Sequence, residues 1–167
     1  MELKVIVNPL AGVGPAKRLL SNLFYGWGYS FYRCKGKLRA DDILIRGKLY
    51  QLLGECRAHL RSLEPAAATQ ALLRAQRDLE GMETAIRTST APEASRVHRQ
   101  ALDERATVEQ LVALDGEVLL ALVTLRDAIA RLQDGPAAAA ETGDLLRATD
   151  FDTLWSRREA LLCGQPG

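Results

Sequence analysis

Apolar residues recur at steps of three and four along most of this chain, which is the pattern of amphipathic α-helices. The clearest early example spans Leu38 to Leu63, where charged residues separate the apolar positions. Its apolar positions follow near-heptad steps: Ile45, Leu49, Leu52, Cys56, Leu60 and Leu63. The spacing predicts a helix with one buried face. Asp41 and Asp42 fall in its first turn, where negative charge is favoured by the helix dipole.

A second amphipathic segment, Thr69 to Arg87, follows after Pro65. Its apolar positions alternate steps of three and four: Leu72, Ala75, Leu79, Met82 and Ile86. Because proline cannot continue a helix undisturbed, Pro65 leaves two arrangements open. The segment is either the second half of a bent rod or the return arm of a hairpin.

The longest predicted helix runs from about Glu93 to Gln133, after the capping-box pair Thr90 and Glu93. Its seam comprises Val97, Ala101, Val108, Leu111, Leu114, Val118, Ala121, Leu125, Ala128 and Leu132. Four further apolar residues widen its second half: Leu119, Leu122, Val123 and Ile129. We therefore expect the second half to be buried on more than one side.

The chain after Asp134-Gly135-Pro136 is expected to form a connector and one last short helix. The alanine-rich residues 137–143 are interpreted as a low-complexity connector. A helix starting at Asp150 or Asp152 follows, and Trp155 is expected to dock it onto the bundle. Four of its residues share one helical face: Phe151, Leu154, Arg158 and Leu161.

The N-terminal part differs from the rest in pattern and composition. The apolar run of residues 3–7 favours a strand by local preference, but no second convincing strand follows it. It is therefore interpreted as an extended arm, a helix overridden by tertiary context or an edge contributed to a partner. From Pro15 to about Arg33, Leu20, Phe24, Trp27 and Phe31 are spaced to share a helical face. The glycines at positions 26 and 28 weaken that helix, so packing or a partner must support it.

These elements predict an all-α fold, an antiparallel bundle of about four to five helices with one long helix. We expect a short N-terminal arm (1–14), a single bundle domain (15–163) and a frayed tail (164–167). The 167 residues suffice for one well-packed domain, and 47% hydrophobic with 26% charged residues is typical of a globular protein.

Charge and aromatic residues concentrate in the same N-terminal stretch. Residues 1–40 carry seven Lys or Arg against Glu2 alone, whereas the remainder is net acidic. Six of the nine aromatic residues lie between Phe24 and Tyr32. The candidate contact residues for a partner or a membrane are Trp27, Tyr29, Tyr32, Arg33, Lys35, Lys37 and Arg39. The aromatic rings could instead fill one end of the bundle and leave the cations in water.

Three kinds of partner fit that composition to different degrees. Exposed Tyr, Trp and Arg are common in protein-binding hot spots. The same residues in an interfacial helix would meet headgroups and anionic lipid. Nucleic acid is disfavoured, because no recognised binding module is present and the rest of the chain is acidic.

Residues Asn8 to Gly14 resemble the NPxSGxG turn that follows the first strand of diacylglycerol kinases and related lipid kinases, with Ala11 in place of the serine. The resemblance implies a phosphate- or nucleotide-binding turn over residues 8–17. It covers only residues 5–20, and no GGDGT-like loop follows.

Other signs of chemistry are sparse. The three cysteines form no CxxC pair, which favours a reducing cytoplasm over a disulfide framework. Cys34 lies between Arg33 and Lys35, a setting that favours its thiolate or acylation. Glu55 and His59 have the wrong spacing for a di-metal bundle. No segment has the length and apolarity of a membrane span, and no signal peptide is recognised.

The sequence therefore predicts no catalytic residue, cofactor or metal, and enzymatic activity stays an open question. We expect a cytoplasmic interaction or adaptor protein that associates with a protein partner or with itself through amphipathic helices. The alternatives are a peripheral membrane protein that uses residues 15–39 and a phosphate-binding protein that uses residues 8–17.

Overall fold

The computed structural model describes residues 14–33, 37–63, 70–89, 105–132 and 136–163. Every regular element within these ranges is an α-helix, which confirms the predicted all-α class. The helices are α1 (Pro15–Leu23), α2 (Leu38–Ser62), α3 (Gln70–Thr88), α5 (Arg105–Ile129), α6 (Pro136–Ala148) and α7 (Phe151–Leu162).

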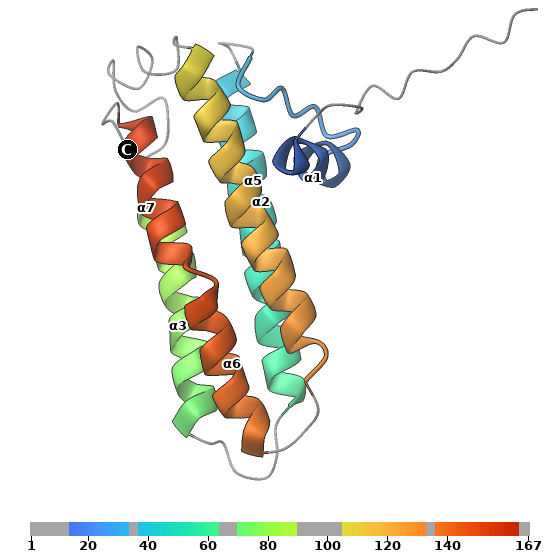
Figure 1. The fold of residues 1–167 in the computed structure, drawn as a ribbon, viewed down its shortest axis with the longest axis vertical. Coiled ribbons are helices and arrows are strands. Elements are labelled where there is room, and N and C mark those ends of the chain that lie inside the picture. The colour runs from blue at the N-terminus through green and yellow to red at the C-terminus, as the bar shows by residue number, and fades with distance from the viewer. Residues whose placement is uncertain (1–13, 34–36, 64–69, 90–104, 133–135, 164–167) are drawn as a thin grey trace, which may run out of the picture.

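The helices form an antiparallel bundle (Figure 1). α2 descends in this view, α3 returns upward, α5 descends, and α6 and α7 rise end to end as the fourth member. α2 packs against α3 and α5, and the pair α6 and α7 packs against both α3 and α5. α1 lies outside this group and packs against α5. Because α3 runs antiparallel beside α2, these two helices form a hairpin and not a bent rod.

The core is formed mainly by the apolar positions that the sequence predicts on the buried faces of α2, α3 and α5. The α2 seam is completely buried at Ile45, Leu49, Leu52, Cys56 and Leu60. α3 adds Leu72, Ala75, Leu79, Met82 and Ile86, and α5 adds Leu111, Leu114, Val118, Leu119, Leu122, Leu125 and Ile129. The widened second half of α5 is buried because it contacts α2 on one side and the α6–α7 pair on the other.

The predicted helix from Pro15 to Arg33 is too long, because α1 ends at Leu23. Gly26 and Gly28 adopt φ angles of 78° and 79°, which are accessible to glycine and end the helix. The predicted common face of Leu20, Phe24, Trp27 and Phe31 therefore does not form. Leu20 and Phe24 enter the core, whereas the Trp27 side chain turns outward.

The predicted connector 137–143 is also wrong, because these residues belong to α6. Alanine is the strongest helix former, and Pro136 at the start of the helix needs no backbone N–H partner. α6 is separated from α7 at Asp150, whose φ of 49° is left-handed, and α7 begins at Phe151, between the two predicted starts.

Several sequence predictions lie outside the described residues. These are the N-terminal arm before residue 14, the first part of the long helix (residues 93–104) and the tail 164–167. The described part of that helix ends at Ile129, four residues before the predicted end at Gln133.

Candidate functional site

The segment from Phe24 to Arg33, here called the aromatic turn, connects α1 toward α2 and is held by one carboxylate. The Oδ1 atom of Asp41 accepts a hydrogen bond from the Ser30 backbone N–H at 2.9 Å. Its Oδ2 atom accepts from the Ser30 hydroxyl at 2.6 Å and from the Tyr32 backbone N–H at 2.7 Å. Asp41 lies in the first turn of α2, so this helix fixes the turn directly.

The aromatic turn contains two consecutive aromatic residues in the left-handed region. Phe31 and Tyr32 have φ angles of 55° and 56°. Such a conformation costs a residue with a Cβ atom roughly 1–2 kcal/mol. Charge-assisted hydrogen bonds to Asp41, each worth about 1.5–3 kcal/mol, are of the size needed to offset this strain.

The rings of the turn separate into an inner and an outer group. Tyr29 is at the centre of the inner group, with ring centroids 5.0 Å from Phe24, 4.8 Å from Phe31 and 6.0 Å from Tyr32. In contrast, Tyr25 is 88% exposed and Trp27 is 71% exposed. The aromatic stretch is therefore divided, since one group of rings packs inward and the other faces solvent.

Beneath the turn, four residues form a buried polar network, here called the charged cluster: Tyr32, Asp42, Asp115 and Arg158. Arg158 of α7 is completely buried, and its Nε atom lies 2.6 Å from Asp115 Oδ1. Its Nη2 atom lies 2.6 Å from Asp42 Oδ1 and donates to the Tyr32 hydroxyl at 3.1 Å. The Tyr32 hydroxyl donates to Asp115 Oδ2 at 2.7 Å. The cluster thus joins α2, α5, α7 and the aromatic turn.

A second arginine extends the charged cluster toward α3. The Nε atom of Arg46 lies 2.7 Å from Asp42 Oδ2, and its Nη1 atom donates to the Ile86 carbonyl and to Ser89 Oγ. The guanidinium groups of Arg46 and Arg158 lie 5.3 Å and 4.8 Å from the centre of the Trp155 ring. Trp155 therefore docks α7 as predicted, and it also adds cation–π contacts to the two arginines.

Burial and mutual charge shift the protonation equilibria of this cluster. Burial alone would lower the pKa of Arg158, but the Asp115 carboxylate raises it well above its ordinary value. Burial raises the pKa of Asp115, against the opposing effect of Arg158. Burial, reinforced by Asp115, also raises the pKa of Tyr29 and of Tyr32. Both tyrosines therefore stay protonated at neutral pH, and Tyr32 serves as a donor to Asp115.

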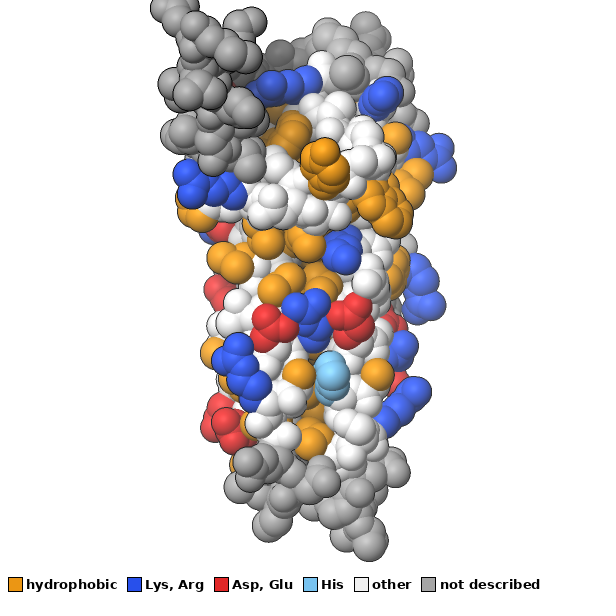
Figure 2. Space-filling view, turned by 90° about the vertical axis from the view of Figure 1, so that its right-hand side faces the viewer, with side chains coloured by type: hydrophobic (Ala, Val, Ile, Leu, Met, Phe, Trp, Pro, Cys, Tyr) orange, Lys and Arg blue, Asp and Glu red, His pale blue; other side chains and the backbone are white. Residues whose placement is uncertain are grey.

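An apolar groove of about 330 Å³ opens between the aromatic turn and α2. It is lined by Leu23, Phe24, Trp27, Ile43, Leu44, Gly47, Lys48 and Gln51. Ile43 is 56% exposed, so α2 presents an apolar side chain to solvent beside Trp27. Figure 2 faces the side of the molecule on which α1 lies, and hydrophobic side chains gather there in its upper half.

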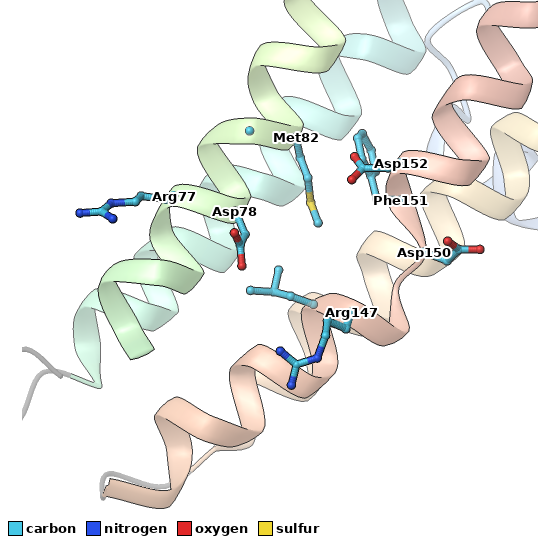
Figure 3. Close-up of a pocket in the computed structure, with 9 residues that line it drawn as sticks. Arg77, Asp78, Met82, Arg147, Asp150, Phe151 and Asp152 are labelled. Atoms are coloured by element: carbon cyan, nitrogen blue, oxygen red, sulfur yellow. The ribbon is translucent and has the colours of Figure 1, made fainter. Parts of the chain in front are cut away.

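A second cavity, of about 440 Å³, lies between α3 and the junction of α6 with α7 (Figure 3). Its lining includes Met82 and Phe151 together with charged residues of both signs, among them Asp78 and Arg147. Arg147 is paired with Asp144, and Arg77 points away from the cavity in Figure 3. Because the charges have mixed sign and are largely exposed, this cavity indicates no particular ligand.

The predicted contact residues are divided by the structure. Trp27, Arg33, Lys37 and Arg39 are exposed, and Lys35 lies outside the described residues, as does Cys34. Tyr29 is half-buried and Tyr32 is buried, so their hydroxyl groups face the charged cluster and not solvent.

Two other candidate groups are explained by packing. Glu55 pairs with Arg126, at 3.2 Å. Cys56 is buried as predicted, and burial raises the pKa of its thiol to about 11, which disfavours a nucleophilic thiolate.

Sequence reasoning missed Asp115 and the roles of Asp41, Asp42 and Arg158. The sequence assigns Asp41 and Asp42 only a favourable place at the helix dipole, whereas both are buried and hold other groups. Arg158 was placed on the apolar face of its helix, and that position was a usable signal of a buried charge. Asp115 lies four residues after Leu111 and three before Val118, so its position on the apolar face of α5 is a second signal.

Comparison with known proteins gives no family for this chain, since no protein-family model, curated protein or solved structure matches it. Across the described ranges, none of the helices combines the length and apolarity required to cross a membrane. Among the same residues, no group of three or more His, Cys, Asp or Glu side chains is arranged to hold a metal ion.

Proposed function

We propose that this chain is a non-catalytic interaction protein whose docking surface is the groove between the aromatic turn and α2. The observation that carries the proposal is the exposure of Trp27 over a groove that is otherwise mainly apolar. Tryptophan is among the residues that account for much of the binding energy in protein interfaces. Hydrogen bonds from the Ser30 and Tyr32 amides to Asp41 fix the backbone of the aromatic turn, which carries Trp27, before binding. This reduces the entropy lost on association.

The charged cluster supports a binding function more than a catalytic one. Its members are already paired with one another at 2.6–3.1 Å, and Arg158 has no solvent-exposed surface. Groups that are committed in this way can orient the turn. They are poorly placed to exchange protons with a substrate, which requires an approach to hydrogen-bond distance.

A peripheral membrane role is the second candidate, because Tyr25 and Trp27 are exposed and the cations Lys37 and Arg39 are exposed as well. Aromatic side chains at the headgroup level and nearby cations are typical of proteins that dock on anionic bilayers. The groove favours a protein partner, since a concave apolar site accepts an inserted side chain. The phosphate-binding alternative at residues 8–17 stays a prediction, because most of that segment is outside the described residues.

Photo-crosslinking separates these functions in the cell that naturally makes the chain. A photoreactive phenylalanine analogue is introduced at position 27, at position 43 and, as control, at position 73, where the native leucine is 44% exposed on α3. We expect one protein partner, or a second copy of the chain, to be captured from positions 27 and 43 only. Capture of the same products from position 73, or of none from position 27, would contradict the proposal, and lipid adducts at position 27 would favour the membrane.

A further inference from the structure

We infer that the occupant of the groove is an acidic amphipathic helix, whose apolar side chains enter the groove and whose carboxylates meet the surrounding cations. This inference rests on the proposed function and adds the chemistry of the partner. It follows from the groove's lining, from the charge around it and from the glycine in its wall.

The lining fixes the apolar part of the partner. Leu23, Phe24, Trp27, Ile43 and Leu44 supply large apolar side chains. The groove of about 330 Å³ is at the small end of the range of about 300–1,000 Å³ for ligand pockets, which suits a few inserted side chains more than a whole extended ligand. No strand edge is available in the described part of the chain for a partner to extend. Helix-in-groove recognition, in which the apolar face of an amphipathic helix lies in a hydrophobic groove, fits this lining.

The charges fix the polar part of the partner. Lys48 is the one charged residue in the lining, and its Nζ atom contacts the neutral Gln51 side chain at 2.9 Å. Between residues 14 and 51 the sequence contains only two carboxylates, Asp41 and Asp42. Both are buried and face internal donors, so they add no negative charge to the surface.

Several cations lie on the same part of the chain. Lys17 and Lys48 are half-buried, and Arg33 and Lys37 are exposed. In the upper half of Figure 2, Lys and Arg side chains border the hydrophobic ones, and Asp and Glu side chains lie lower or at the margin. The exposed carboxylates of the neighbouring α5, Glu109 and Glu117, do not line the groove. The surface is thus complementary to negative charge, which gives specificity and faster association.

Gly47 leaves room for another backbone to approach the groove. It lies in the interior of α2, where glycine is less stable than alanine. A Cβ atom at this position would meet no described atom within 4 Å, so packing inside the chain does not require glycine. Gly47 lines the groove, and the space left by its missing side chain allows a helix to pack closely on α2.

A displayed library of amphipathic helices tests the inference on the full chain. The library keeps apolar residues at i, i+3, i+4 and i+7 and randomises the flanking positions among Glu, Lys and Gln. Clones that bind the wild type are re-tested against Trp27→Ala and Gly47→Leu. We expect the clones that lose binding to both variants to be enriched in Glu, with affinity that falls as salt is added.

This experiment distinguishes an error in the charge of the partner from an error in the groove as the docking surface. Clones that depend on Trp27 and Gly47 but are neutral or basic would overturn the acidic partner and leave the groove as a docking surface. An absence of dependent clones would overturn both the acidic partner and the docking surface. If no clone depends on these residues but the chain sediments with vesicles containing an anionic phospholipid in a Trp27-dependent way, a membrane is the occupant.

Charge reversal at the groove gives a second measurement, because it changes a surface charge and leaves the aliphatic core intact. Lys48→Glu should weaken the acidic clones roughly fivefold and strengthen clones with Lys at the facing positions. Arg74→Glu on α3 is the matched control, because Arg74 is exposed and does not line the groove. Equal effects of the two reversals would indicate general attraction to the whole chain and would overturn the assignment of Lys48.

Discussion

At the lower end of the bundle in Figure 1, α2, α3 and α5 meet through aliphatic side chains, whereas near the upper end α2, α5 and α7 meet around the Arg158 guanidinium. Leu60, Leu125 and Ile129 are typical of the aliphatic end. Contacts of that kind are non-directional, and cores built from them tolerate substitutions of similar volume. The charged cluster instead depends on distances and angles that a small displacement would spoil.

The difference explains where the candidate docking surface lies. A buried ion pair is weak evidence for stability, because desolvation of the charges opposes their attraction. Its geometric demands can nevertheless fix one arrangement of the elements that it joins. Here those elements include the aromatic turn, through the Tyr32 hydroxyl, and Asp41 fixes the same turn one residue away on α2. The aliphatic end stabilises the bundle, and the charged end orients the turn that carries Trp27.

The variant Arg158→Met gives the strongest test of the difference between the charged end and the aliphatic end. Methionine keeps much of the volume but leaves Asp42 and Asp115 buried without their shared cation. Removing one partner of a buried pair costs about 3–5 kcal/mol, so we expect the free energy of unfolding in urea to fall by that amount. Arg157→Met is the matched control, because the neighbouring Arg157 is exposed. A loss below about 1 kcal/mol would mean that the cluster does not hold the upper end.

Leu122→Ala tests the aliphatic end. Leu122 of α5 is completely buried, and truncating a core leucine to alanine costs about 2–5 kcal/mol, so we expect a loss near 3 kcal/mol. The native protein should keep the wild-type fluorescence of Trp27, since the aromatic turn is held by other residues. A changed emission of Trp27 in the folded variant would show that the two ends are coupled, and a Trp27→Phe background isolates the contribution of Trp155.

The two ends also differ in how well the sequence predicted them. The seams of α2, α3 and α5 follow from periodicity, because an aliphatic residue at a seam position is buried in almost any bundle. The charged end is harder, since Asp42 in the first turn of α2 has the same local pattern whether it is solvated or buried. Its partner Arg158 is 116 residues away in the sequence, and only the tertiary fold brings them together. The wrong helix face for Trp27 has a local cause. The spacing of the apolar residues predicts a helix there, although Gly26 and Gly28 on either side of Trp27 favour a turn.

Asp41→Ala removes the carboxylate that holds the aromatic turn and leaves the Ser30 and Tyr32 amides without their acceptor. Unpaired donors of this kind cost about 1–3 kcal/mol, so we expect the free energy of unfolding to fall by about 2 kcal/mol. Amide hydrogen exchange should accelerate at Ser30 and Tyr32 in particular. Asp152→Ala is the control, because Asp152 occupies the first turn of α7 but is exposed. Unchanged exchange in the turn would contradict its anchoring by Asp41.

Tyr29→Phe gives the smallest effect and shows it only at alkaline pH. Burial raises the pKa of Tyr29 in the folded chain, whereas in the unfolded chain it ionises near its ordinary value of about 10. Above that pH the unfolded state binds fewer protons than the folded state, so the free energy of unfolding falls as pH rises. Removing this hydroxyl should make that fall less steep by about 1.4 kcal/mol per pH unit, measured by urea unfolding at several pH values. The surface variant Leu120→Ala should keep the wild-type slope, since it removes no titrating group. Equal slopes for Tyr29→Phe and the wild type would mean that this hydroxyl reaches solvent, and that the inner rings are as accessible as the outer ones.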